Sequence, residues 1–354
     1  MPRWPGVPGG TRVTRSEQPR LAVTIAPGLE LANPVMPASG CFGPELGAIV
    51  DLDHLGALVT KTIFLNPRSG NPAHRVTETH GGMLNSVGIP SRGVGAFVDE
   101  LLPRYAAYRP PTIVSIGGLS IEEYFDVADR LADVPHVAAL ELNISCPNLE
   151  AGGLEIGANP HHVERVVRGV VDRVQVPVIS KLTPNVTSIT DIARASEAGG
   201  AAAVTAINAI VGMAVDLRGR RTQLGNNTGG LTGPATKALA LRMVWQVARA
   251  ISLPVIGVGG ICTAEDALEF LVVGATAVQV GTATFTRPDT MLRIISGLRA
   301  WLAREGVADV RELIGSLQTG PAGHGLAAAH GRHATLAVND YGAGTQNTRR
   351  SGRR

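Results

Sequence analysis

Cysteine is scarce in this chain: Cys41, Cys146 and Cys262 are the three examples among 354 residues. Three cysteines cannot form a disulfide framework, and none of them has the C-x-x-C spacing of a metal cluster. The histidines lack an H-E-x-x-H spacing, so we predict no metal site. We therefore expect a protein of the reducing cytoplasm.

Long hydrophobic runs are also missing. Stretches such as residues 201–207 fall far short of the ~20 apolar residues that a bilayer span needs. The amino terminus, M-P-R-W-P-G-V-P-G-G, has no continuous apolar segment of the kind found in signal peptides. These absences argue against a membrane span and against association with a membrane.

Charged residues are few, at 17%, whereas hydrophobic residues make up 44% and the mean hydropathy is +0.15. This composition excludes a disordered protein. The isoelectric point of about 9.0 comes from the ends of the chain. Residues 1–20 carry a net charge of +3 and residues 315–354 carry +4, which leaves −4 for the body. We expect solvated tails rather than a nucleic-acid surface.

The composition along the chain indicates one domain between two tails. Residues 1–20 contain four Pro and three Gly and are predicted to form a disordered leader. Residues 315–354 are rich in Gly, His and Arg and are predicted to form a flexible tail. No linker or low-complexity segment interrupts residues 21–314, which we assign to a single domain.

Short β-branched runs alternate with helical patterns throughout that domain. Strands that are apolar on both faces are predicted at Val35–Ser39, Ala57–Thr62, Ile113–Ile116, Ala138–Ile144, Val176–Leu182, Ala202–Ile207, Val255–Val258 and Ala277–Val280. Eight strands with helical crossovers predict an α/β fold, a (β/α)8 TIM barrel. A doubly wound open sheet is the alternative, but no G-x-G-x-x-G follows the first strand. Residues 21–31 are expected to form a small hairpin that closes the bottom of the barrel.

Helix-capping residues support this alternation. Asn159, Ser188 and Thr263 each precede a helical pattern and are predicted to cap it. The second and third of these patterns stop at Gly199 and Gly274, shortly before a predicted strand.

Polar residues follow the strands at the end where TIM barrels place their active sites. In chain order they are Ser39, Lys61, Thr62, Asn143, Cys146, Lys181, Asn208, Gly259, Gly260, Gly281 and Thr282. The chain has three lysines among its 32 basic residues, and two of them stand in this set. The placement indicates that ammonium groups serve the chemistry of the site.

The glycines after the last two strands predict a phosphate site. Without Cβ atoms, the backbone at Gly259, Gly260 and Gly281 can approach an anion closely and point its N–H groups toward it. The helix that starts near Thr263 is expected to add partial positive charge from its N-terminus.

Cys146 is the cysteine with polar surroundings, since it stands in E-L-N-I-S-C-P-N (141–148). We interpret it as a titratable group and assign Cys41 and Cys262 to packing.

Asparagines gather at the predicted mouth of the barrel. Asn85 lies in a long segment between the second and third strands, and a loop of that length is typical of a lid. With Asn143, Asn148 and Asn208 it offers amide donors and acceptors that suit a planar ligand with carbonyl and N–H edges.

Taken together, these segments resemble the class 1 dihydroorotate dehydrogenases. The resemblance runs through N-P-V-M-P-A-S-G, T-K-T, N-P-R-S-G-N-P, G-G-M-L-N, E-L-N-I-S-C-P-N, K-L-T-P-N, G-G-L-T-G-P-A, G-V-G-G-I and V-G-T-A, and covers about residues 25–310. It implies a (β/α)8 barrel with FMN as cofactor that oxidises (S)-dihydroorotate to orotate in pyrimidine biosynthesis.

The same resemblance implies roles for individual residues. Cys146 would be the catalytic base. Contacts to FMN are implied for Ser39, Lys61, Thr62, Asn143, Lys181, Ile207, Gly233, Gly259, Gly260, Gly281 and Thr282. Contacts to the substrate are implied for Lys61, Asn85, Ser86, Val87, Gly88, Ile89, Asn143, Asn208 and Ala209.

Two positions depart from the family pattern. Ala209 stands where the family usually has Thr or Ser, which removes a hydroxyl near the substrate. Ser115 stands where the family often has an Asn near the flavin, so that contact is left open.

The chemistry of the reaction accounts for these residue types. Oxidation of a dihydropyrimidine removes a proton from C5, here assigned to Cys146, and a hydride from C6, which N5 of FMN accepts. A thiol with an ordinary pKa of ~8.5 suits this task where nearby ammonium groups lower that pKa. We assign Lys181 to the negative charge that develops on the reduced flavin and Lys61 to the substrate carboxylate.

Within the family, the stretch N-L-E-A-G-G-L-E-I-G after the cysteine is similar to the NAD-linked 1B form. That form implies a homodimer core in a heterotetramer, with a separate FAD and iron–sulfur subunit that passes electrons to NAD. The fumarate-linked 1A form is the alternative. The membrane-linked class, with Ser as base and a helical anchor, is disfavoured by Cys146 and the proline-broken leader.

Two further readings belong to other classes of protein. A Schiff-base aldolase would use Lys181 as its amine nucleophile at a strand end. A flavin-binding module without enzymatic activity would keep the cofactor site and lack the reaction.

Overall fold

The computed structural model describes residues 18–144 and 156–320. Cys146, residues 1–17 of the predicted leader and residues 321–354 of the predicted tail lie outside the described residues. The compact unit that contains the barrel ends at Leu317, whose backbone N–H donates to the carbonyl of Val272.

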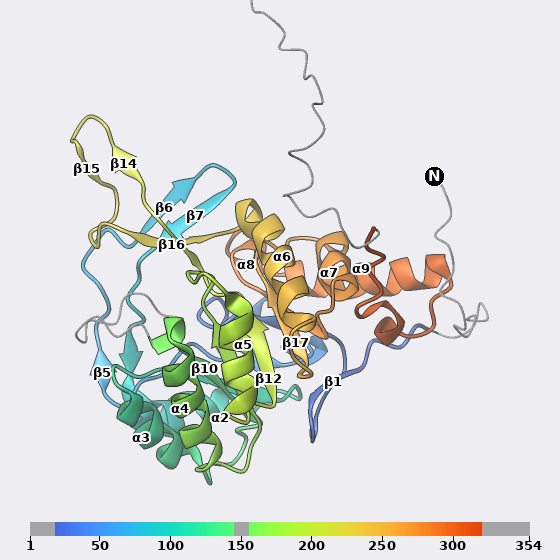
Figure 1. The fold of residues 1–354 in the computed structure, drawn as a ribbon, viewed down its shortest axis with the longest axis horizontal. Coiled ribbons are helices and arrows are strands. Elements are labelled where there is room, and N and C mark those ends of the chain that lie inside the picture. The colour runs from blue at the N-terminus through green and yellow to red at the C-terminus, as the bar shows by residue number, and fades with distance from the viewer. Residues whose placement is uncertain (1–17, 145–155, 321–354) are drawn as a thin grey trace, which may run out of the picture. The chain divides into compact units, whose positions relative to one another are not determined.

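Eight parallel strands form one sheet that curls into a barrel (Figure 1). They are β3 (Val35–Pro37), β4 (Leu58–Val59), β9 (Thr112–Ile116), β10 (Ala139–Asn143), β11 (Val178–Leu182), β12 (Ala203–Ala206), β17 (Val255–Val258) and β18 (Ala277–Val280). Their order is β3-β18-β17-β12-β11-β10-β9-β4. The N–H of Gly56 donates to the carbonyl of Val35 at 2.8 Å and links the two end strands. Each predicted strand overlaps one of these eight, so the predicted (β/α)8 barrel is confirmed.

The barrel strands are buried along their whole length, because helices cover one face and strand side chains fill the other. The interior is not apolar throughout, however. Ser115, Glu141, Lys181, Thr205 and Gln279 are all buried strand residues with polar side chains. The prediction of strands apolar on both faces was therefore wrong at these positions, and the inner surface is polar toward one end.

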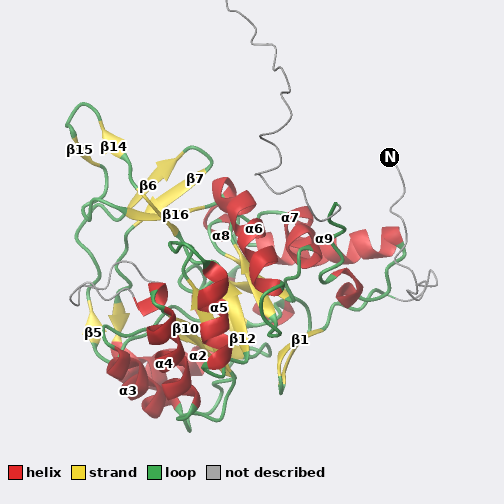
Figure 2. Ribbon diagram, in the orientation of Figure 1, coloured by secondary structure: helices red, strands yellow, loops and turns green. Residues whose placement is uncertain are grey.

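Helices surround the strands (Figure 2). The α-helices among the described residues are α1 (Gly93–Ala96), α2 (Leu102–Tyr105), α3 (Ile121–Leu131), α4 (Pro160–Val171), α5 (Ile189–Ala198), α6 (Lys237–Ala248), α7 (Ala264–Val272), α8 (Ala283–Thr286) and α9 (Thr290–Glu305). In α3, for example, Tyr124, Val127 and Leu131 recur at helical spacing and are buried against the core. No helix within the described residues is long and apolar enough to cross a membrane.

Two of the three predicted helix caps form as expected. The Asn159 side chain accepts from the N–H groups of His161 and His162. Thr263 accepts from the N–H of Asp266, whose carboxylate accepts from the N–H of Thr263 in a capping box. Ser188 holds the cap position of α5 without a hydrogen bond from its side chain to the helix backbone.

The amino-terminal hairpin is confirmed as well. It consists of β1 (Val23–Ala26) and β2 (Leu29–Leu31), which pair antiparallel across a turn at Gly28. Gly28 has a φ of +77°, in the left-handed region that favours glycine. The apolar side chains of the hairpin belong to the hydrophobic core.

A second sheet lies over the mouth of the barrel. It has the order β13-β16-β7-β6 and consists of β6 (Val76–Thr79), β7 (Gly82–Asn85), β13 (Ile210–Gly212) and β16 (Gly229–Thr232). The segment between β4 and β9, predicted as one long loop, contains two of these strands and the pair β5 (Pro67–Arg68) and β8 (Ser91–Arg92). It forms a wall of the mouth rather than an unstructured lid.

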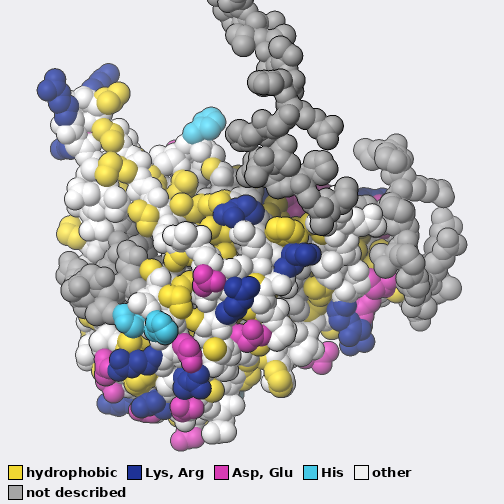
Figure 3. Space-filling model, in the orientation of Figure 1, with side chains coloured by type: hydrophobic (Ala, Val, Ile, Leu, Met, Phe, Trp, Pro, Cys, Tyr) yellow, Lys and Arg dark blue, Asp and Glu magenta, His cyan; other side chains and the backbone are white. Residues whose placement is uncertain are grey.

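A narrow hairpin of β14 (Val215–Asp216) and β15 (Arg221–Thr222) extends from this mouth sheet (Figure 1). Apolar side chains at Met213, Val215 and Leu217 alternate through β14 and the residues beside it and remain exposed, with Leu217 the most exposed at 85%. Figure 3 shows hydrophobic side chains along this arm and basic ones at its tip.

The caps provide a matched pair for a stability test. Thr263→Ala removes a side-chain cap bond to a backbone N–H, so we expect it to lower the free energy of unfolding by ~1 kcal/mol. Ser188→Ala occupies the same kind of position without such a bond and is expected to cost clearly less. Urea unfolding of both variants measures the difference, and equal losses would contradict it.

Candidate active site

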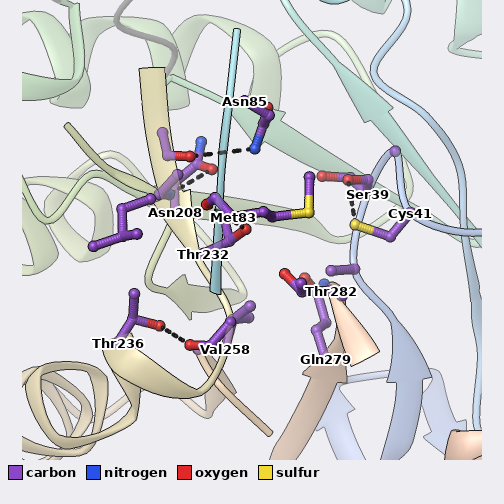
Figure 4. Close-up of a pocket in the computed structure, with 18 of the residues that line it drawn as sticks. Ser39, Cys41, Met83, Asn85, Asn208, Thr232, Thr236, Val258, Gln279 and Thr282 are labelled. Carbon is purple, nitrogen blue, oxygen red and sulfur yellow. Dashed lines mark hydrogen bonds between the residues drawn. The ribbon is translucent and has the colours of Figure 1, made fainter. Parts of the chain in front are cut away.

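A cavity of about 320 Å³ opens where the carboxyl ends of the barrel strands meet the mouth sheet. Its walls come from the segments after β3, β4, β12, β17 and β18, from the carboxyl-terminal parts of β10 and β11, and from β7 and β16. Such a volume is large enough for a small organic ligand. Figure 4 shows two sides of this cavity, with Asn85 and Asn208 on one and Ser39, Cys41, Gln279 and Thr282 on the other.

Nearly all of the predicted site residues line this cavity. They are Ser39, Lys61, Thr62, Asn85, Val87, Gly88, Ile89, Asn143, Lys181, Ile207, Asn208, Ala209, Gly233, Gly259, Gly260, Gly281 and Thr282. Ser86 is not part of the wall; it is buried and accepts a hydrogen bond from Nδ2 of Asn71 at 2.8 Å. The predicted base, Cys146, lies outside the described residues.

Glycines leave one end of the cavity open to a ligand. Gly260 has a φ of +68°, and a Cβ on it would lie 2.9 Å from the carbonyl oxygen of Gly233. Gly233 has a φ of +99°, and its own Cβ would lie 2.8 Å from Cα of Gly82. Neither position tolerates a side chain, so bare backbone forms this end of the site, as a phosphate cradle requires.

The neighbouring N-terminus of α7 is occupied by the chain itself. Oδ2 of Asp266 accepts from the N–H groups of Cys262 and Thr263, each at 2.9 Å. The third lysine, Lys237, donates to Asp266 at 2.7 Å and to Glu269 at 3.0 Å. Two N–H groups just before this helix are therefore used by its own carboxylate. The expected contribution of the helix terminus to anion binding stays a prediction.

A buried ion pair forms the floor of the cavity. Nζ of Lys181 lies 3.3 Å from Oε1 of Glu141 and donates to Oγ of Ser39 at 3.0 Å and Oε1 of Gln279 at 3.1 Å. Lys181 is 3% exposed and Glu141 0%. The ammonium thus reaches the cavity while the carboxylate stays behind it.

A chain of amides and hydroxyls forms another part of the wall. Nδ2 of Asn208 donates to Oδ1 of Asn143 at 3.2 Å, and Nδ2 of Asn143 donates to Oγ1 of Thr62 at 3.0 Å. Thr62 in turn shares a 2.9 Å hydrogen bond with Ser115, which is fully buried. Ser115 therefore supports Thr62 and does not form part of the cavity wall.

The mouth sheet positions the asparagine at the outer side. Nδ2 of Asn85, at the end of β7, donates to the carbonyl of Gly230 in β16 at 3.4 Å. A Cβ on Gly230 would lie 2.5 Å from that of Ala209, so Ala209 packs on bare backbone at this point. Pairing of β7 with β16 therefore brings Asn85 and Ala209 to the same wall.

Cys41 and Cys262, both assigned to packing from the sequence, form part of the cavity wall. Burial raises the pKa of the Cys41 thiol to about 11, although the nearby positive charge of Lys181 opposes this. Burial and the carboxylate of Asp266 also raise the pKa of Cys262. Both thiols are neutral near pH 7 and poor candidates for a base.

The electrostatics of the cavity suit an anion. Lys61 and Lys181 line it, and the wall contains no carboxylate among the described residues. Partial burial lowers the pKa of the Lys61 ammonium, and the positive charge of Arg75 lowers it further. No cluster of His, Cys, Asp or Glu that could hold a metal occurs in the described part of the chain.

Several residues of the site were not predicted from the sequence. Met83, Gln279 and Phe285 line the cavity, and Glu141 stands directly behind it. Glu141 and Gln279 sit inside strands, and a charged or amide residue in an otherwise apolar strand was the available signal. That signal becomes useful only once the barrel shows which strand residues point inward.

The family model and the most similar relatives point to the same family. The model of the dihydroorotate dehydrogenase family matches residues 20–302. A protein of Geotalea uraniireducens named dihydroorotate dehydrogenase B (NAD(+)), catalytic subunit, is 49% identical over 304 residues, covering 85% of this chain and 99% of its own. Proteins of the same name from Trichlorobacter lovleyi and Geobacter sulfurreducens are each 50% identical, with the same coverage.

Lys61 in the cavity wall and Lys237 in α6 are expected to be acetylated at different rates. Because burial and Arg75 lower the pKa of Lys61, more of it is neutral at pH 9, and trace acetylation should modify it faster than Lys237. Hydrogen bonds to Asp266 and Glu269 raise the pKa of Lys237. Mass spectrometry measures both rates. Arg75→Gln should slow the modification of Lys61, and a Lys237 that reacts as fast as Lys61 would refute the assignment.

Proposed function

The chain belongs to the dihydroorotate dehydrogenase family, and we propose that its cavity binds FMN and dihydroorotate side by side, with Cys146 as the base. The enzyme oxidises dihydroorotate to orotate in pyrimidine biosynthesis, and its reaction is flavin-dependent with NAD as the final acceptor. The observation that carries the proposal is one cavity with a glycine cradle at one end and ammonium and amide groups elsewhere along its wall.

The residues present would fit FMN. Gly233, Gly259, Gly260, Gly281 and Thr282 would hold its phosphate with backbone N–H groups, since no side chain fits at Gly233 or Gly260. The remaining contacts would come from Ser39, Lys61, Thr62, Asn143, Lys181 and Ile207. When bound, FMN supplies the acceptor for the hydride that leaves C6 of the substrate. Lys181 would stabilise negative charge near the cofactor.

The substrate would lie against the wall formed by Asn85, Val87–Ile89, Asn143 and Asn208. Asparagine amides donate and accept at once, which matches the carbonyl and N–H edges of a pyrimidine ring. Lys61 would pair with the substrate carboxylate. Ser86, turned away from the cavity, would act only through its neighbours, and Ala209 would contact the ring without a hydroxyl.

Cys146 would remove the proton from C5. It follows three residues after Asn143, the last residue of β10, which lies in the cavity wall. A thiolate is needed for this step, and ammonium groups near the cavity favour the thiolate form. The elevated pKa values of Cys41 and Cys262 leave Cys146 as the cysteine suited to the task.

A second subunit completes the enzyme. The relatives carry the name of a catalytic subunit, which implies a partner. We propose that this partner carries FAD and an iron–sulfur cluster and delivers the electrons to NAD in the cytoplasm. Three cysteines in the whole chain are too few to bind such a cluster. Two catalytic subunits would form the core of a heterotetramer.

Spectroscopy of the purified chain tests the reaction. We expect a yellow protein whose flavin absorption bleaches when dihydroorotate is added without oxygen. NAD should not restore the colour until the partner subunit is supplied. Rapid recovery with fumarate alone would instead identify the 1A type.

Two results would overturn the function altogether. A yellow protein that dihydroorotate leaves unbleached would be a flavin-binding module. A colourless protein in which borohydride traps a carbonyl substrate on Lys181 would be an aldolase.

The role of Cys146 is tested by Cys146→Ser and Cys146→Ala. General base catalysis contributes ~10²–10⁴-fold, so at pH 7 we expect flavin reduction by dihydroorotate to slow by at least ~10²-fold in both variants. FMN binding should be unchanged, because the side chain is assigned to the substrate. Stopped-flow absorbance measures the rate.

The pH dependence separates a base from a spacer. The rate of the unmodified enzyme should rise with pH as the thiol loses its proton, whereas the Ala variant should lack this dependence. Near-normal reduction by the Ser variant at pH 7 would rule out Cys146 as the base.

A further inference from the structure

One buried charged group of the site has no part in the mechanism above. The carboxylate of Glu141 in β10 has no exposed surface and lies inside the barrel, beneath the cavity. A buried carboxylate is costly unless it is paired and hydrogen-bonded. Its partners therefore indicate what it does.

We propose that Glu141 is a positioning residue that keeps Lys181 protonated and directs its ammonium group toward the flavin. This inference rests on the proposed function, because it assumes that FMN occupies the cavity. It adds a residue that does not itself touch cofactor or substrate but decides the charge of one that does.

The hydrogen bonds of Lys181 support the directing role. An ammonium group has three N–H donors, and here they face Glu141, Gln279 and Ser39. Glu141 and Gln279 are buried, whereas Ser39 is only partly so and lines the cavity. A ligand could therefore replace the Ser39 contact while the two buried partners hold the lysine in place.

The carboxylate is itself held on both oxygens. Oε1 faces Lys181, while Oε2 accepts from Nε2 of Gln279 at 2.6 Å and from Oγ1 of Thr205 at 3.0 Å. Gln279 thus bridges the pair, accepting from Lys181 and donating to Glu141. Both carboxylate oxygens thus have hydrogen-bond donors, and Oε1 is the one that faces the ammonium group of Lys181.

Other charges near Lys181 do not replace this one. The charge of Lys181 acts on the thiol of Cys41, but burial raises the pKa of that thiol to about 11, so it is largely neutral at pH 9. Lys61 lines the same cavity, but a lysine cannot supply a negative charge. The remaining contacts of the ammonium, Ser39 and Gln279, are uncharged. Without Glu141, the buried lysine would lose its compensating charge and give up its proton more readily.

Sulfite binding to the FMN-loaded chain tests the proposal. Sulfite adds reversibly to oxidised flavins and leaves negative charge on the ring, so its affinity reports positive charge nearby. We compare Glu141→Gln with the unmodified protein from pH 6 to pH 9, using the ratio of their dissociation constants to cancel the ionisation of sulfite. Sulfite should bind the variant comparably at pH 6 and at least ~10-fold more weakly at pH 9.

Two further variants distinguish charge from packing. Thr205→Val removes a hydrogen bond from the same carboxylate without removing the charge. The ratio of its sulfite dissociation constant to that of the unmodified protein should not change with pH. Glu141→Asp keeps the charge and should restore the pH-independent behaviour. A ratio for Glu141→Gln that is constant across this range would overturn the proposal.

If Glu141→Gln alone does not fold, the double variant Glu141→Gln, Lys181→Met tests whether Glu141 acts through Lys181. If Glu141 acts only through Lys181, the double variant binds sulfite like Lys181→Met at every pH. A clear difference between those two proteins refutes the proposal. Bleaching of the unmodified chain by dihydroorotate tests the proposed function separately, so failure of that reaction is distinguished from failure of this inference.

Discussion

The ion pair between Lys181 and Glu141 is the interaction on which the rest of the site depends. The barrel interior has a low dielectric constant, so neither charge is tolerated there alone. Each partner comes from its own strand, β11 and β10, and the shared hydrogen bonds extend to Thr205 in β12 and Gln279 in β18. A single polar cluster thus ties four barrel strands together and delivers one ammonium group to the cavity.

Local patterns in the sequence predicted the barrel well. The β-branched runs and helix caps depend on neighbouring residues, and all eight predicted strands overlap an observed strand. The inward orientation of single residues depends on register instead. Glu141 and Gln279 were missed for that reason. Ser86 directly follows β7 and is buried, so its expected contact with the substrate stays a prediction.

The mouth sheet shows the other limit of sequence reasoning. Its strands are short and rich in glycine, and β16 consists of Gly229–Thr232, so no hydrophobic alternation identifies them. Their pairing joins segments from two separate excursions of the chain. The long segment around Asn85 was therefore predicted as a loop, although its length correctly indicated a role at the mouth.

That pairing has a consequence for the order of events during synthesis. Gly230 pairs with Asn85 at a sequence separation of 145 residues, and contacts of such separation form late because a long loop must first close. A nascent polypeptide that has not yet emerged beyond β16 cannot build this wall. A bound cofactor would then stabilise the finished barrel and leave its incomplete precursors unaffected. The chain would therefore retain its cofactor only once its synthesis is complete.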